Sequence, residues 1–209
     1  MRDIFIFGTG GFAREVADIV FACGDKPILI ANNISDLSAY SGGVEAIVEE
    51  RIDQIKNGVF VIGIGENSTR RLIYQRYRHL DFVNVFHPSA TFGIGQRALV
   101  EAGSGNIVCA GVRMTNSIKV GDFVIINLNA TIGHDVQIDS FVNIAPGANI
   151  SGFVHVEEGV WIGTNGAINQ GSRDASLRLG SNTTVGSGSV VVKSCEADSI
   201  YVGVPARKR

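Results

Sequence analysis

Residues 120–168 decide the fold, and they read VGDFVIINLNATIGHDVQIDSFVNIAPGANISGFVHVEEGVWIGTNGAI. An aliphatic residue returns at every sixth position of this stretch. The column consists of Val120, Ile126, Ile132, Ile138, Ile144, Ile150, Val156, Ile162 and Ile168. A second column, two positions earlier, is mostly β-branched or small. A period of six fits neither an amphipathic helix nor a two-faced strand. It predicts a parallel β-helix of hexapeptide repeats, in which three flat faces close a turn of about eighteen residues.

The repeat changes register once, after Ile168. The next aliphatic corner, Leu179, comes eleven residues later instead of twelve. We therefore expect a small distortion or loop in the coil wall at residues 171–174. Val185 and Val191 then continue the period of six.

The chain before the coil has a different pattern. Residues 2–7 alternate with isoleucine and phenylalanine, a glycine-rich turn follows, and residues 12–20 have helical periodicity. Further strands are expected over residues 27–31, 59–65 and 82–86, with a helix from 67 to about 78. Strands that alternate with helices predict a small parallel sheet covered on both faces, which is a Rossmann-like α/β domain. We place this domain at residues 1–86 and the all-β coil at 87–209.

Composition excludes several classes of function. The 209 residues carry a net charge of only −2, with dispersed Lys and Arg, so we expect no nucleic-acid partner and no anionic-membrane surface. No apolar run approaches the ~20 residues of a spanning helix, so no membrane insertion is expected. Three widely spaced cysteines without a signal peptide favour a reducing cytoplasm.

The glycine turn at residues 8–11 is a candidate phosphate site. Gly10 and Gly11 would present backbone N–H groups at a helix N-terminus, where an anion is held. The third glycine of a dinucleotide fingerprint is missing, and no acidic residue ends the second strand. The turn therefore indicates either a phosphate-bearing ligand other than NAD or a plain tight turn.

His134 is the candidate catalytic residue of the coil. It follows the inward Ile132 by two positions, so its side chain should leave the bore at a corner. Asp135 could orient the imidazole, and Asn127, about one face earlier, could position a substrate. Gly152 lies eighteen residues later, one coil above, where its N–H could meet an oxyanion. The alternative is a structural histidine.

A zinc site is the competing interpretation. Such a site would need three converging histidines. His155 is the other histidine of the regular coil, and its spacing from His134 puts it at a different phase of the turn. We expect no metal.

The whole chain resembles the sialic-acid O-acetyltransferase-like family of hexapeptide acyltransferases, especially the N-acetyltransferases of nucleotide-linked 4-amino sugars. The motifs that carry the resemblance are GTGG at 8–11, IGENSTR at 64–70, HPSA at 87–90, IGHD at 132–135 and GVPA at 203–206. The resemblance implies a left-handed coil, a homotrimer, and acetyl-CoA bound in the groove between chains.

The resemblance also implies residue roles. His134 is the general base, Asp135 its acidic partner, and Gly152 the amide that receives the thioester oxygen. The acetyl-CoA groove is implied to include Asn143, Gly152, Thr164 and Ser187. The nucleotide sugar is implied to contact Gly10, Gly11, Phe12, Asn32, Asn33, Gly65 and Ser68. Three departures stand out: Asn143 and Phe12 replace histidines common in the family, and Asn32-Asn33 replaces two aspartates of a uridine-binding relative.

The expected function is acetyl transfer from acetyl-CoA to the 4-amino group of a nucleotide-linked amino-deoxy sugar for a surface glycan. An amine must lose a proton in order to attack, and an imidazole is a suitable base near neutral pH. UDP, dTDP and GDP all remain open as the nucleotide. O-acetylation of a sialic acid or another sugar hydroxyl is the first alternative, and a non-catalytic nucleotide-sugar sensor is the second.

Overall fold

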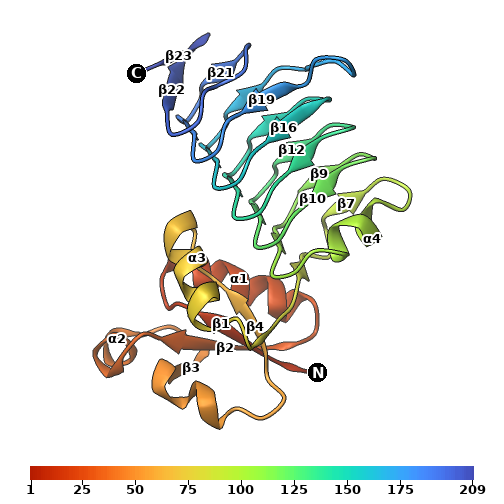
Figure 1. Cartoon of the computed structure of the whole chain (residues 1–209). Helices are drawn as coiled ribbons and strands as arrows, with labels where there is room; N and C mark the ends of the chain where they lie inside the picture. The colour runs from red at the N-terminus through yellow and green to blue at the C-terminus, as the bar shows by residue number, and fades with distance from the viewer.

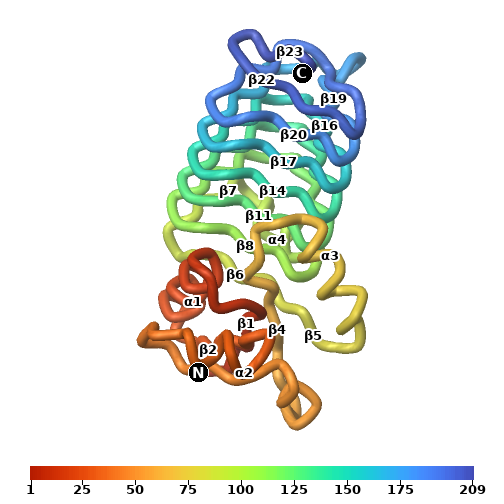
Figure 2. Tube along the Cα trace, turned by 90° about the vertical axis from the view of Figure 1, so that its left-hand side faces the viewer, coloured from red at the N-terminus to blue at the C-terminus, as the bar shows by residue number.

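A computed structural model describes residues 1–209 and contains an α/β part followed by a coil of short strands (Figure 1). Turned by 90°, the same chain shows the coil rungs stacked above the α/β part, with the C-terminus at the far end of the coil (Figure 2). The predicted fold class is confirmed: a Rossmann-like parallel sheet precedes a left-handed parallel β-helix of hexapeptide repeats.

The α/β part is built on a five-stranded parallel sheet of order β3-β2-β1-β4-β5. Its strands are β1 (Asp3–Phe7), β2 (Lys26–Ala31), β3 (Glu45–Val48), β4 (Val59–Ile62) and β5 (Asp81–Phe82). Its helices are α1 (Gly11–Ala22), α2 (Ile34–Ala39), the 3-10 helix η1 (Glu49–Gln54) and α3 (Asn67–Arg76). The order reverses between β1 and β4, and ligands of such sheets bind outside the carboxyl ends of the strands at this point.

Both faces of this sheet are buried, which explains the continuous apolar strands. Ile4 and Ile6 of β1 pack in one cluster with the apolar side of α1. Phe5 and Phe7, which alternate with them, pack in a second cluster with Tyr77 just after α3. The two helices therefore lie on opposite faces of the sheet.

The sequence prediction is wrong at two strands. It does not include β3, because Glu45–Val48 is short and starts with a charged residue. The single strand expected over 82–86 is two strands: β5 ends at Phe82, and β6 (Val85–Phe86) belongs to the coil. The N–H of Val85 donates to the carbonyl of Asn106 at 2.9 Å, so this segment pairs with the coil.

The coil has three faces, which we call first, second and third in chain order. The first face contains β6, β8 (Ile107–Val108), β11 (Ile125–Ile126), β14 (Asn143–Ile144), β17 (Trp161–Ile162), β20 (Thr184–Val185), β22 (Ile200–Gly203) and β23 (Ala206–Lys208). The second contains β7 (Thr91–Phe92), β9 (Arg113–Met114), β12 (Thr131–Ile132), β15 (Asn149–Ile150), β18 (Ala167–Ile168) and β21 (Val190–Val191). The third contains β10 (Lys119–Val120), β13 (Gln137–Ile138), β16 (Val154–Val156) and β19 (Leu177–Leu179).

The register of the coil follows the hexapeptide period. Ile126 pairs with Ile144 and Ile132 with Ile150, eighteen positions apart in both cases. The inward side chains form one cluster of 27 buried residues along the bore. A single rung buries little by itself, so each rung depends on its neighbours for a core.

The register break after β18 is larger than one residue. Leu179 pairs with Val156, 23 positions earlier rather than eighteen, so five residues are inserted between β18 and β19. The prediction of a loop at 171–174 is confirmed, but the interpretation of the spacing as two hexapeptides less one residue is wrong. The spacing is one hexapeptide plus five residues.

Helix α4 (Gln96–Glu101) interrupts the lowest rungs. Gln96 is buried, and its side chain donates to the carbonyl of Ile118 at 2.8 Å and accepts from the Ile118 N–H at 2.9 Å. Val100 joins the bore cluster. The helix thus packs beside β10 of the third face and adds Val100 to the core of the bore.

The α/β part covers the base of the first face. α1 packs against the outward side chains of Ile107 and Ile125. Tyr74 of α3 packs against Phe123 and Phe141 at the corner between the third and first faces, with ring centroids 4.5 Å and 6.0 Å apart. The α/β part therefore packs on the coil mainly through its first face.

Candidate active site

His134 and Asp135 form the corner between the second and third faces. Asp135 has a left-handed backbone, with φ of 57°, which turns the chain from β12 toward β13. His134 Nδ1 lies 2.8 Å from Asp135 Oδ2, and the His134 side chain is 45% exposed. A carboxylate only accepts hydrogen bonds, so Nδ1 carries the proton and donates. Nε2 of the neutral ring keeps its lone pair for a substrate.

Gly152 lies one coil above His134, as its spacing predicted. A Cβ on Gly152 would lie 2.6 Å from His134 Cε1 and 2.7 Å from Nε2, so a side chain there would displace the ring. No hydrogen bond within the chain uses the N–H of Gly152. Gly152 is buried, and a Cβ on Gly133 would lie 2.8 Å from that nitrogen, so a side chain at position 133 would crowd the amide. Phe153 packs edge-on against the imidazole, with centroids 5.1 Å apart.

This corner combines two chemical functions. The free Nε2 can accept a proton from a nucleophile, and Asp135 can stabilise the imidazolium that results. The Gly152 N–H, which has no partner within the chain, can donate to an oxygen that gains negative charge. Together they suit nucleophilic attack on a carbonyl.

Asn127 does not lie beside His134 in the same chain. It follows β11, at the corner between the first and second faces, so β12 separates the two residues. Its Oδ1 accepts the N–H of Leu128 at 2.7 Å. Thr164 and Ser187 follow β17 and β20 at the same corner on higher rungs, and both are exposed. Thr164 and Ser187, two of the four predicted acetyl-CoA residues, therefore occupy a different corner from the predicted base, whereas Gly152 lies beside it.

Asn143 and Gly65 contact each other between the two parts of the chain. Asn143 is only 3% exposed, and its Nδ2 donates to the Gly65 carbonyl at 2.8 Å. Its Oδ1 is buried without a hydrogen-bond partner. The carbonyl of Gly65 sets the orientation of this amide, because only the NH₂ end can donate to it. The resemblance assigned these residues to different ligands, so the sequence did not reveal this contact.

Arg70 holds the loop that contains Gly65. It is fully buried, and its guanidinium donates to five acceptors: the carbonyls of Ile64, Gly65, Phe123 and Val142 and the side chain of Asn67. Burial lowers the pKa of Arg70 to about 10. Arg70 thus joins the α/β part to two rungs of the coil. The only sequence signal for this role was its position inside the 64–70 motif.

The glycine turn presents unused backbone donors. Gly10 precedes α1 with φ of −72° and no side-chain cap, and no hydrogen bond uses the N–H groups of Gly11, Phe12 or Ala13. A Cβ on Gly10 or Gly11 would meet nothing within 4 Å. Crowding within the chain therefore does not require these glycines. Gly8 differs, because its φ is 110° and a Cβ there would lie 2.9 Å from Ile64 Cδ1.

The other predicted substrate residues have distinct surroundings. Asn33 caps α2, and its Oδ1 accepts the Asp36 N–H at 2.8 Å. Ser68 Oγ donates to Glu66 Oε2 at 2.6 Å near the start of α3. Asn32 makes no side-chain hydrogen bond and borders a cavity of about 300 Å³ at the carboxyl edge of the sheet.

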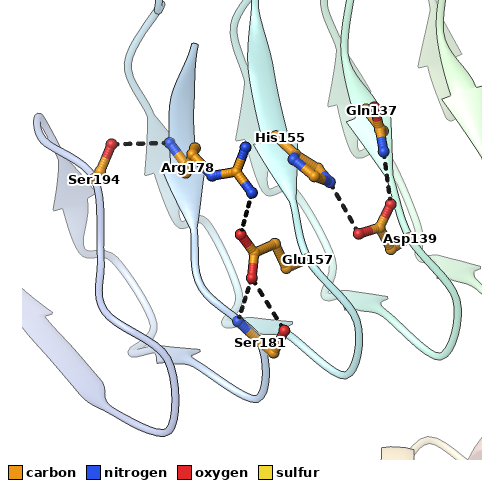
Figure 3. A network of polar contacts seen from close by, with 7 residues as sticks. All are labelled: Gln137, Asp139, His155, Glu157, Arg178, Ser181 and Ser194. Atoms are coloured by element: carbon orange, nitrogen blue, oxygen red, sulfur yellow. Dashed lines mark hydrogen bonds and ion pairs between the residues drawn. The ribbon is translucent and has the colours of Figure 1, made fainter. Parts of the chain in front are cut away.

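The remaining histidines have local partners. His155 on the third face is bonded to Asp139, with Nε2 and Oδ2 2.9 Å apart, in a surface network that continues through Gln137 (Figure 3). His87 Nδ1 lies 2.8 Å from Ser89 Oγ. No group of three or more His, Cys, Asp or Glu side chains could hold a metal ion. No helix has the length and apolar character needed to cross a membrane.

Comparison with known proteins matches both parts of the chain. The family described as the PglD N-terminal domain matches residues 3–77. A GDP-perosamine N-acetyltransferase from Escherichia coli O157:H7 is 27% identical over 215 residues, covering 97% of this chain and 94% of that protein. PerB from Caulobacter crescentus, solved in complex with CoA and GDP-perosamine, is 25% identical, with a TM-score of 0.85 over 100% of this chain and 98% of PerB. The chain is thus similar over nearly its whole length to N-acetyltransferases of nucleotide-linked sugars.

A third protein matches the α/β part and the coil together, in the same relative arrangement. WeeI from Acinetobacter baumannii AYE superposes over 100% of both chains, with a TM-score of 0.88 and 25% identity. The resemblance seen in the sequence is thus confirmed. Every predicted nucleotide-sugar residue lies within residues 3–77, the segment matched by the PglD N-terminal domain.

Proposed function

We propose that this protein transfers the acetyl group of acetyl-CoA to the 4-amino group of a nucleotide-linked amino-deoxy sugar. The observation that carries the proposal is the His134 corner, where an imidazole nitrogen without a hydrogen-bond partner lies beside Gly152, whose N–H makes no hydrogen bond within the chain. The relatives support the acceptor class, because one is a GDP-perosamine N-acetyltransferase and another was solved with CoA and GDP-perosamine.

The residues of the corner have complementary roles in this reaction. His134 Nε2 accepts a proton from the sugar amine as the nitrogen bonds to the thioester carbonyl carbon. The Gly152 N–H donates to the carbonyl oxygen, which becomes negatively charged. As the carbon–sulfur bond breaks, His134 returns the proton to the sulfur and free CoA leaves. Asp135 stabilises the imidazolium between these steps.

The glycine turn is proposed to hold the diphosphate. The unused N–H groups of Gly11 and Phe12 lie in the first turn of α1, where the helix dipole favours an anion. The open space next to Gly10 would admit a phosphate. Residues 1–86 would then bind the nucleotide sugar, and residues 87–209 would bind acetyl-CoA and carry the base.

A homotrimer is part of the proposal. One corner of the coil contains Asn127, Thr164 and Ser187, and another contains His134. The two walls of the proposed acetyl-CoA groove are therefore at separate corners of any one chain. Side-by-side packing of coils would bring the corner of one chain to the corner of the next. Light scattering should give three chains per particle; an active monomer at micromolar concentration would contradict this.

We also place the reaction in the cytoplasm. The three cysteines, Cys23, Cys109 and Cys195, are all free thiols, which fits a reducing compartment.

Product analysis tests the function. The full chain is incubated with acetyl-CoA and a panel of nucleotide-linked 4-amino sugars, and free CoA is measured together with the mass of the sugar product. The expected result is an N-acetylated sugar. Acetylation only of sialic acid or another hydroxyl acceptor would establish the O-acetyltransferase alternative, and absence of both CoA binding and turnover would favour a nucleotide-sugar sensor.

A further inference from the structure

The cavity beside Asn32 has the composition of a nucleobase site. It is bordered by the carboxyl ends of β1 and β2, the loop after β4, and α3. Its volume is about 300 Å³, and apolar side chains such as Ile30, Ile64 and Ile73 form much of its wall. Gly8, at its edge, leads directly into the free N–H groups at the start of α1. A diphosphate on that turn would therefore place an attached nucleoside near this cavity.

Glu49 provides a carboxylate to this apolar cavity. It is the first residue of η1, and its side chain is 13% exposed. Its Oε1 accepts from the Tyr77 hydroxyl and lies 2.9 Å from Arg76 Nη1. Burial, together with the bond to Glu49, raises the pKa of Tyr77 to about 12, so this hydroxyl stays protonated and donates.

The second oxygen of Glu49 is free. No hydrogen bond within the chain reaches Oε2. This oxygen is accessible from outside the chain, because the only buried side-chain oxygen or nitrogen without a hydrogen-bond partner is Asn143 Oδ1. Contacts that fix Oε1 hold the carboxylate in place and leave Oε2 to accept from a molecule in the cavity. Asn32, also without a side-chain bond, offers an amide donor and acceptor nearby.

The chemistry of the bases favours guanine. Guanine has two adjacent donors, N1–H and the N2 amino group, which a carboxylate can accept together as charge-assisted bonds. The ring nitrogen at the equivalent edge of adenine or cytosine is an acceptor and would be repelled. Uracil and thymine have one N3–H between two carbonyl oxygens, which would face the negative charge.

We propose that this cavity binds the nucleobase and that Glu49 selects guanine. The inference rests on the proposed function for the presence of a nucleotide sugar, and it names the nucleotide. The free Oε2 of Glu49 would accept from both N1–H and N2–H, and Asn32 would donate to a guanine acceptor at the mouth of the cavity.

Nucleotide binding to the wild-type chain tests the proposal without any substitution. Isothermal titration with GDP, IDP, UDP, dTDP and ADP should give the tightest binding for GDP. IDP lacks the N2 amino group and should bind about tenfold more weakly or worse, the loss expected for one bond to a charged acceptor. Equal affinity for GDP and IDP, or preference for UDP, dTDP or ADP, would overturn the proposal.

A matched pair of variants then assigns the effect to Glu49. Glu49→Gln should lower GDP affinity at least tenfold and reduce the GDP preference, whereas Glu50→Gln, at the exposed next position, should change neither. An unchanged order of nucleotides in a folded Glu49→Gln protein would refute the role of Glu49. Because these measurements need no acetyl transfer, Glu49-dependent GDP binding without turnover would sustain this inference and reject the proposed activity. Acetyl transfer that proceeds equally well in Glu49→Gln, with an unchanged nucleotide preference, would reject this inference and sustain the proposed activity.

Discussion

The backbone of Gly152 lies against the imidazole of His134, so closely that a Cβ on Gly152 would be 2.7 Å from Nε2. The two residues are eighteen positions apart, one turn of the coil. The missing side chain allows the ring to lie beside an unused backbone N–H. A proton acceptor and a hydrogen-bond donor are thus positioned together by the coil repeat itself.

His134→Ala should lower kcat by about 10²–10⁴-fold, because it removes the proposed general base. The side chain is 45% exposed and outside the bore, so folding and CoA binding should be retained. Steady-state kinetics, circular dichroism and CoA titration check these outcomes. A folded variant with more than about a tenth of the wild-type kcat would remove His134 from this role.

Gly152→Ala should lower kcat by at least about tenfold while the thermal midpoint changes little. The new methyl group would meet the imidazole at 2.6 Å from Cε1, so the ring must turn away from its position beside the amide. Ser151→Ala, at the exposed preceding residue, is the control and should retain activity. Wild-type kcat in Gly152→Ala would show that this ring position is not needed.

Gly10→Val should raise the KM for the nucleotide sugar at least about tenfold and leave CoA binding unchanged. Its φ of −72° suits any residue, and nothing within 4 Å of the new Cβ opposes it, so the stability cost should stay near ~1 kcal/mol, the loss expected for a poorer helix cap. Kinetics with each substrate varied in turn, together with urea unfolding, measure both effects. An unchanged KM would place the diphosphate elsewhere.

Arg70→Met should lower the free energy of unfolding by about 3 kcal/mol, because four carbonyls and the Asn67 side chain lose a buried donor. Arg71→Met is the comparison: this neighbour pairs with Glu158 and lies over the Phe141 ring at a part-exposed position. Its loss should cost less than about 1 kcal/mol. Equal losses in urea unfolding would show that Arg70 does not join the two parts of the chain.

The coil could be derived from the sequence because its physical rule is local and repeats. A period of six places the same side of each hexapeptide in the bore, and burial of Ile126, Ile132 and Ile144 then sets the pairing of every rung. The same rule predicts from spacing alone that Gly152 lies one turn above His134. The Gly10 turn can be found for a similar reason, since a strand, a glycine turn and a helix are adjacent in the chain.

The periodic rule failed where the period was interrupted. The five-residue insertion before Leu179 was hidden because one hexapeptide plus five residues differs from two hexapeptides by only one position. Val85 was assigned to the wrong sheet because a short apolar strand can pair with either neighbour. Only the three-dimensional pairing with Ile107 decided between them.

Sequence alone thus determined the hexapeptide coil, the α/β sheet before it and the His134 corner, because each depends on periodicity or on residues one turn apart. Tertiary structure alone decided the contacts between the two parts. Arg70 meets Phe123 and Val142, and Asn143 meets Gly65 across 78 positions. No periodic pattern specifies these contacts. They arise from the docking of two surfaces, where shape, burial and the pairing of polar groups select one arrangement.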